Sequence, residues 1–199
     1  MRRFWIVGAV VWLVFTPALA KATDAGELIR GLTEEAIGIL ESTEQDSQER
    51  KTKLESLFRS SMDIPFVGKF VVGRYWRQMN EAEKAEYMEA FEHYVLSVYA
   101  GRLNEYSGES IRVLDTRPVD EIDTIVTSQL TRKDRAPVAV DWRVRQNGND
   151  AKVIDVSVEG VSMAMTQRQE FNSILQREGV GGLIKRLESP QPRDPGPPR

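Results

Sequence analysis

Cysteine is absent from this chain of 199 residues, and histidine occurs only once, as His93. Without cysteine the protein has no disulfide bond, no thiolate metal site and no thiol nucleophile. One histidine is too few for the multi-histidine sites that hold catalytic zinc. Acidic residues (30) outnumber lysine and arginine (27), and a net charge of −3 argues against nucleic acid as a partner. We therefore expect neither a metal or other cofactor nor a nucleic-acid partner.

The beginning of the chain has the pattern of a secretory signal peptide. A basic start precedes an uncharged apolar run at residues 4–15, and a small-x-small sequence follows at residues 18–20. The run is about a dozen residues long, short of the roughly 20 that a membrane-spanning helix needs, and an uncleaved anchor is the alternative. We predict a signal peptide over residues 1–20, cleaved after Ala20 or Ala22. Export without cysteine suits a Gram-negative periplasm.

Proline is concentrated at the other end of the chain. Five of the nine prolines lie in residues 189–199, a composition that opposes both a helix and a packed core. We predict that this tail is disordered. The foldable unit is then a domain over residues 24–188, long enough to bury a sizeable core, and we expect it to be a monomer.

Helices are predicted in the first half of the domain, because apolar residues recur there at steps of three and four. The first runs from Asp24 to Glu41 and the second from about Ser47 to Ser60. A short third helix, Phe66 to Tyr75, is apolar nearly all round and must be enclosed or line something apolar. A long helix from Glu81 to about Tyr106 follows.

Strands are predicted after Gly108, where the apolar period changes from 3.6 to 2. Short connections between successive strands make the sheet antiparallel. The strands are expected around residues 111–113, 122–130, 138–144 and 153–161, and the last helix from Met165 or Thr166 to about Arg177, with glycines breaking it before residues 183–187.

This order of elements predicts an α+β fold. We expect the N-terminal helices and the long helix to pack on one face of a curved four-stranded antiparallel sheet, because each strand has one apolar and one polar face. A sheet curved around a helix commonly leaves an apolar cavity, which is where a functional site is expected.

Residues that could carry chemistry are few. No phosphate-binding glycine loop, zinc-protease motif or nucleophile elbow occurs. His93 lies off the apolar stripe of its helix and fits a solvated position better than a catalytic base. Asp141 and Asp155 could form a carboxylate pair on adjacent strands, but they more simply balance the basic residues of the same strands. The basic loop at residues 132–135 could contact an anionic head group, although loop charges are usually only solvated.

A resemblance to a known family rests on five segments. They are DIPFVGKF at residues 63–70, GRYW at 73–76, YSGE at 106–109, VDWR at 140–143 and EGVSM at 159–163. In this order, and over residues 24–188, the chain resembles the MlaC family of periplasmic lipid-binding proteins. That family includes toluene-tolerance auxiliary proteins and the hopanoid-associated HpnM branch.

The resemblance implies a fold related to nuclear transport factor 2-like domains, with a deep apolar pocket for lipid tails. It implies a non-enzymatic carrier that shuttles lipid between an inner-membrane MCE-type ABC transporter and an outer-membrane partner. The lipid would be a phospholipid or a hopanoid, because residues 140–145 and 163–168 look closer to the HpnM branch.

The pocket is expected to be lined by the apolar residues near Tyr75, on the Tyr99 face of the long helix, and around Val161. Tyr99 and Val161 match family positions expected to face the pocket. The complete expected lining is Phe70, Val72, Tyr75, Val95, Tyr99, Leu103, Val140, Trp142, Val158, Val161 and Met163.

Two other functions remain open at this point. A cavity enzyme of the isomerase or dehydratase type on the same fold would use Asp141 or His93 as its base, and this requires that group inside the pocket. A scaffold or adaptor would instead have a filled core, without a cavity large enough for a lipid tail.

Overall fold

The computed structural model describes residues 24–45, 47–103, 106, 108–133 and 135–189, without the side chains of residues 99–103. The predicted signal peptide and residues 190–199 of the proline-rich tail lie outside this part of the chain. Within it, no helix is both long and apolar enough to cross a membrane.

The described residues form an α+β fold, as predicted. The helices are α1 (Ala25–Ser42), α2 (Gln48–Ser61), α3 (Ile64–Val72), α4 (Glu81–Leu103) and α5 (Met163–Glu188), with a 3₁₀ turn, η1 (Gly73–Arg77), after α3. The strands are β1 (Ser110–Pro118), β2 (Asp123–Thr131), β3 (Val138–Asn147), β4 (Asp150–Val158) and β5 (Val161–Ser162). They form an antiparallel sheet in the order β1-β2-β3-β4-β5, and the two-residue β5 adds one strand to the predicted four.

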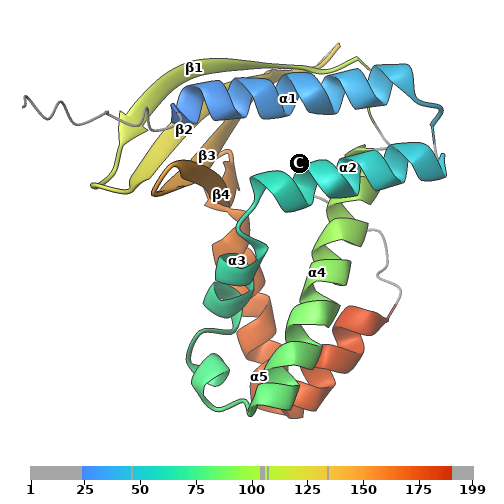
Figure 1. The fold of residues 1–199 in the computed structure, drawn as a ribbon, viewed down its shortest axis with the longest axis vertical. Helices are drawn as coiled ribbons and strands as arrows, with labels where there is room; N and C mark the ends of the chain where they lie inside the picture. The colour runs from blue at the N-terminus through green and yellow to red at the C-terminus, as the bar shows by residue number, and fades with distance from the viewer. Residues whose placement is uncertain (1–23, 46, 104–105, 107, 134, 190–199) are drawn as a thin grey trace, which may run out of the picture.

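The elements are arranged in two parts, each with its own apolar cluster. In Figure 1, α1 lies along the sheet, α3, α4 and α5 extend away from it, and α2 lies between the two parts. Ile29 of α1 packs with Val126 and its neighbours in the sheet. Phe91 of α4 meets Phe171 of α5 edge to face in the second cluster, with ring centroids 6.2 Å apart. Met62 packs against both clusters and joins them.

Polar side chains fix where the helices begin, because they bond to backbone N–H groups that have no partner inside the helix. Ser162 accepts a hydrogen bond from the N–H of Met165, so α5 begins at Met163, two or three residues before its predicted start at Met165 or Thr166. The helix kinks at Gly179, whose φ of 69° favours glycine. The caps of α1, α2, α3 and α5 are Asp24, Ser47, Asp63 and Ser162.

A bulge in β4 changes the alternation that the sequence predicts. Arg143 of β3 pairs with Asp155, but the next residue, Val144, pairs with Val153. Ile154 is therefore an extra residue in β4, and both Val153 and Ile154 are buried.

Asp123, fully buried at the start of β2, organises the charges of the sheet. Its carboxylate accepts hydrogen bonds from Nε and Nη2 of Arg145 at 2.7 and 2.8 Å, and from Nε of Arg143 at 2.9 Å. The hydrogen bond from Arg145 lowers the pKa of Asp123. The side chains of Arg143 and Arg145 thus form ion pairs with Asp123, and not with Asp141 or Asp155 as the sequence pattern suggested.

Replacing Gly68 by alanine is expected to destabilise the protein by about 1–3 kcal/mol. A Cβ at this position of α3 would lie 2.9 Å from Sδ of Met88 and 2.9 Å from Cδ1 of Phe91, and the Phe91 ring is buried. Gly31 is the matched control, because a Cβ built there in α1 meets no atom within 4 Å apart from its chain neighbours and the adjacent backbone of its own helix. Gly31→Ala is expected to stabilise by up to about 1 kcal/mol through helix propensity. Urea unfolding followed by circular dichroism measures both effects, and equal midpoints for the two variants would contradict close packing of α3 on α4.

Candidate functional site

A cavity of about 740 Å³ lies between the two parts of the fold. Ligand-binding pockets range over roughly 300–1,000 Å³, so its size suits a small organic molecule or part of a lipid. The helices contribute Leu32, Thr33, Ala36, Ile37, Leu40, Leu54, Leu57, Phe58, Ser61, Val67, Val71, Phe91, Tyr94, Val95, Met163, Ala164 and Gln167. The strands contribute Ile111, Leu130, Trp142, Val153, Ile154, Asp155, Val156 and Val158.

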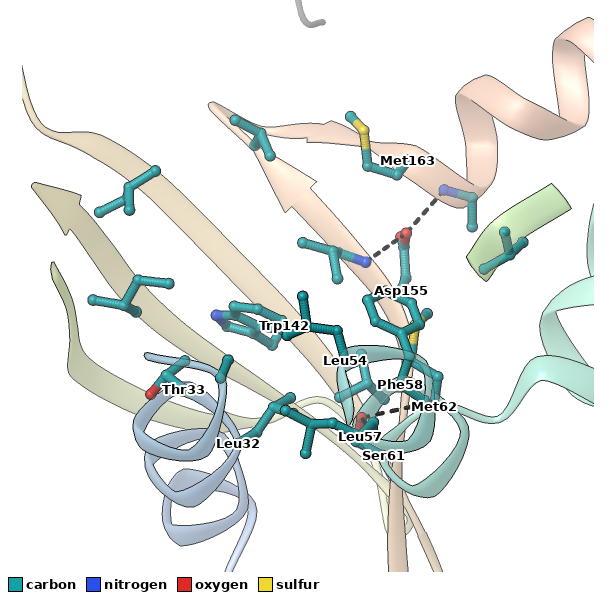
Figure 2. A pocket seen from close by; sticks show the side chains of 18 of the residues that line it. Leu32, Thr33, Leu54, Leu57, Phe58, Ser61, Met62, Trp142, Asp155 and Met163 are labelled. Atoms are coloured by element: carbon teal, nitrogen blue, oxygen red, sulfur yellow. Dashed lines mark hydrogen bonds between the residues drawn. The ribbon is translucent and has the colours of Figure 1, made fainter. Parts of the chain in front are cut away.

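The walls formed by α1 and α2 are apolar because their cavity residues recur with the helical period. Leu32 and Ala36 of α1 are four residues apart, and Leu54 and Leu57 of α2 are three apart. Figure 2 shows the indole of Trp142, from β3, in the space bordered by Leu32 and Leu54. Hydrocarbon from three separate elements therefore faces the same space.

Several polar groups on this wall are already hydrogen-bonded within the protein. The hydroxyls of Thr33 and Ser61 donate to carbonyl oxygens one turn earlier in their own helices, at 2.9 and 2.7 Å. The indole N–H of Trp142 donates to a buried serine hydroxyl on β2 at 2.9 Å. Tyr94 of α4 donates to Oε1 of Gln167 on α5 at 3.0 Å. These bonds leave mainly C–H groups to face a ligand, which suits alkyl chains that need no fixed polar contact.

Asp155 places a carboxylate on the cavity wall, and this carboxylate accepts hydrogen bonds from neighbouring parts of the chain. Its Oδ1 accepts hydrogen bonds from the N–H groups of Val156 at 2.8 Å and Ala164 at 3.0 Å (Figure 2). Its Oδ2 accepts the hydroxyl of Ser162 at 2.5 Å. Asp155 therefore fastens β4 to the beginning of α5.

One end of the cavity is charged. Glu109 and Arg132 stand just outside the paired ends of β1 and β2, so the two residues lie at the same end of the sheet. Lys133 and Arg135, from the β2–β3 loop, line this end as well. Burial, followed by the carboxylates of Glu41 and Glu109, raises the pKa of the Tyr106 hydroxyl, which also lines the cavity. The cavity thus combines a hydrocarbon wall with a charged end.

Some of the residues expected to line the pocket do reach the cavity. Val95, Trp142, Val158 and Met163 lie on its wall. The expected residues Tyr99 and Leu103 belong to α4, but their side chains lie outside the described part of the chain. Their role remains a prediction.

Five expected residues have other surroundings. Val72 is buried in the cluster between α3, α4 and α5, and Phe70 and Tyr75 pack against that cluster. Val140 is buried in β3 but is not among the residues that line the cavity. Val161 of β5 is 45% exposed. Apolar character alone therefore did not separate the cavity wall from the core.

The two ionisable residues considered for catalysis lie elsewhere. His93 is exposed on α4. Asp141 accepts a hydrogen bond from the hydroxyl of Thr127 at 2.7 Å, and neither Asp141 nor His93 lines the cavity. Among the described residues, no group of three or more His, Cys, Asp or Glu side chains could hold a metal ion. An enzyme that uses either residue as a base inside the cavity has no support in this arrangement.

The cavity faces of α1 and α2 were missed by reasoning from the sequence. Their apolar stripes are visible there, but such a stripe predicts only that a helix face is covered. The basic residues Arg132, Lys133 and Arg135 were noticed, yet their position at the end of a cavity depends on how β1, β2 and β3 pair.

An apolar cavity with one charged end suits a largely hydrocarbon molecule and is typical of lipid-binding proteins. The chain belongs to the MlaC family, since the family model described as MlaC protein matches residues 30–189. It is 22% identical to the toluene tolerance protein ttg2D of Pseudomonas putida over 178 residues, which are 86% of this chain and 83% of the relative. It is 21% identical to the intermembrane phospholipid transport system binding protein MlaC of Haemophilus influenzae over 148 residues, 72% of this chain and 69% of the relative.

A solved structure has the same fold. The phospholipid-binding protein from Ralstonia solanacearum, in complex with a phospholipid, superimposes with a TM-score of 0.70 at 22% sequence identity. The match covers 83% of this chain and 95% of the other.

Proposed function

We propose that this protein binds the tails of a phospholipid in its cavity and carries the lipid through the periplasm. The observation that carries the proposal is the cavity of about 740 Å³, whose walls come from both apolar clusters and whose polar groups are largely bonded internally. A relative named as a phospholipid transport binding protein and a fold neighbour in complex with a phospholipid support it.

The energetics of carrying a lipid explain why such a cavity is needed. Exposing one methylene group to water costs roughly 0.8 kcal/mol of free energy. Exposing a whole acyl chain of about 16 carbons therefore costs about 13 kcal/mol. Enclosure in an apolar cavity offsets this cost. Flexible side chains such as Met62 and Met163 tolerate changing contents, so the lipid can still be released to a membrane.

The wider role belongs to the same proposal. The protein would be exported by its signal peptide and act as the soluble, monomeric and non-enzymatic component of an MCE-type ABC transport system. It would pass lipid between the inner-membrane complex and an outer-membrane partner. The name of the Haemophilus influenzae relative, a binding protein of an intermembrane phospholipid transport system, supports this assignment.

Lipid analysis of the purified mature protein tests the proposal. Organic extraction followed by mass spectrometry is expected to find about one phospholipid per protein, and the delipidated protein is expected to take up phospholipid from liposomes. A hopanoid in the extract would assign the ligand to the other lipid class. Absence of any lipid from the extract, together with no uptake from liposomes, would contradict a carrier function.

A further inference from the structure

The charged end of the cavity contains a polar atom without a partner. Nε of Arg132 is buried, and it is the one buried side-chain nitrogen or oxygen in the described part of the chain that has no hydrogen bond. Burying a charged donor without an acceptor is unfavourable, and such groups in native proteins usually have a partner. The missing partner of a guanidinium is an acceptor, and a negatively charged oxygen is the strongest kind.

The surroundings of Arg132 favour an anion rather than a neutral acceptor. Lys133 and Arg135 line the same end of the cavity, so three cations gather there in a chain whose net charge is −3. Two carboxylates also line the cavity. Glu109 stands at the same end as the three cations, and Asp155 lies on the β4 wall, where it accepts hydrogen bonds from Ser162 and two backbone N–H groups. Even with Asp134, which lies between Lys133 and Arg135 in the sequence, the three basic residues outnumber the acidic ones at this end, and the excess positive charge favours an anion although the whole protein is acidic.

The hydrocarbon wall and the cationic end are parts of the same cavity. Leu130, at the end of β2, lines the cavity two residues before Arg132, and Ile111 of β1 pairs with Leu130 and lines it too. A molecule with alkyl tails against this wall would place its head group near the guanidinium. A phosphodiester at the head of a lipid has the charge and the planar pair of oxygens that arginine binds best.

We propose that Arg132 binds the phosphodiester of the lipid head group, and that Lys133 and Arg135 favour phospholipids whose head group is negatively charged overall. This inference rests on the proposed function, because it assigns the head-group end of the same cavity. Arg132 would act as a binding residue, and the two exposed cations would act through their charge.

Competitive lipid uptake by the full mature chain tests the head-group site. Delipidated protein is incubated with phosphatidylcholine vesicles that contain equal amounts of phosphatidylglycerol and diacylglycerol with the same tails, and bound lipid is quantified by native mass spectrometry. The wild type is expected to prefer phosphatidylglycerol over diacylglycerol by about tenfold or more, as one charge-assisted hydrogen bond can supply. Arg132→Gln is expected to remove most of this preference while diacylglycerol uptake stays unchanged.

Matched variants separate charge from fold. Arg112→Gln makes the same charge change at an exposed position of β1 that does not line the cavity, so it should keep the wild-type preference. Arg132→Lys should retain part of it. The double variant Lys133→Gln/Arg135→Gln should lower the ratio of phosphatidylglycerol to phosphatidylcholine, and added salt should lower that ratio in the wild type. Because Nε of Arg132 has no partner to lose, Arg132→Gln should melt no lower than the wild type.

Each other result has a distinct meaning. If Arg132→Gln lowers the uptake of all three lipids by the same factor, Arg132 does not recognise the head group and this inference is wrong. The proposed function, binding of lipid tails in the cavity, would still stand on the uptake by the wild type. A wild type that takes up phosphatidylglycerol and diacylglycerol equally, while calorimetry shows Arg132-dependent binding of inorganic phosphate, would assign the site to a free anion. A wild type that takes up none of the three lipids would overturn the carrier function and this inference with it.

Discussion

Replacing Ala36 by tryptophan is expected to lower phospholipid affinity by about a hundredfold. Ala36 lies on the cavity side of α1, between the apolar clusters, and an indole there would occupy space that lipid tails need. Displacing three or four methylenes into water costs about 3 kcal/mol, which corresponds to roughly two orders of magnitude in the dissociation constant. Uptake of phosphatidylglycerol from vesicles, quantified by native mass spectrometry, measures the loss.

The control for Ala36→Trp is Glu35→Trp, which places the same side chain at the neighbouring exposed position of α1. It should bind lipid like the wild type. If Ala36→Trp lowers the melting temperature so far that binding cannot be compared, Ile37→Trp fills the cavity from the next position. A folded Ala36→Trp or Ile37→Trp variant with wild-type lipid uptake would show that lipid tails do not use this cavity.

The positions of the helices could be predicted because their signals are local. Asp24, Ser47 and Asp63 each bond to N–H groups within their own first turns, so the cap and its helix are read from a few neighbouring residues. The predicted start was two residues late at α3, which begins at Ile64 and not at Phe66, and two or three residues late at α5. There the cap is Ser162, whose hydroxyl also donates to Asp155 in another strand.

The cavity wall could be predicted only in part, because it depends on which apolar faces fail to meet. Trp142 and Val95 were expected on the wall and lie there. Val72 looks equally suitable in the sequence. Val71 and Val72 of α3 both belong to the cluster with α4 and α5, but of the two Val71 alone also lines the cavity. Periodicity shows that a face is apolar, and it does not show whether a side chain or a space lies opposite.

The charged residues show the same limit for long-range pairing. Asp141 and Asp155 have the spacing of partners for the strand arginines, but the register of β2 on β3 places Asp123 opposite Arg145. The carboxylate of Asp155 instead accepts a hydrogen bond from the N–H of Ala164 in the first turn of α5. The sequence pattern identifies the charged residues but not their partners, and register alone does not settle these either, because Arg143 lies opposite Asp155 and bonds to Asp123.

Removing the carboxylate of Asp123 should be among the most destabilising single changes in the protein. Asp123→Ala leaves Arg143 and Arg145 without the buried partner that holds β2 to β3, and breaking such a pair costs about 3 kcal/mol. Urea unfolding at pH 7 measures the difference. Asp115→Ala is the control, since this carboxylate is exposed on β1 and its removal should change the free energy of unfolding by less than about 0.5 kcal/mol.

The contribution of Asp123 should depend on pH in one direction only. Its pKa is lower in the folded protein than the ordinary value near 3.9, because Arg145 and Arg143 bond to the charged form. The folded state therefore binds fewer protons than the unfolded state, and stability from this pair is complete above about pH 5 and is lost as pH falls through the lowered pKa. The gap between wild type and Asp123→Asn should shrink between pH 5 and pH 3. A gap that is unchanged at pH 3 would show that packing, and not the ion pair, makes Asp123 important.

The same variants should separate stability from lipid binding. Asp123 lies at the start of β2, opposite Arg145, whereas Arg132 lies beyond the other end of that strand. Asp123→Asn is therefore expected to unfold at lower urea but, while folded at neutral pH, to keep the wild-type ratio of phosphatidylglycerol to diacylglycerol. Arg132→Gln should do the reverse, with unchanged urea unfolding and a lost head-group preference. Coupled losses in both variants would mean that the charged end of the cavity is maintained by the whole sheet rather than by its own loop.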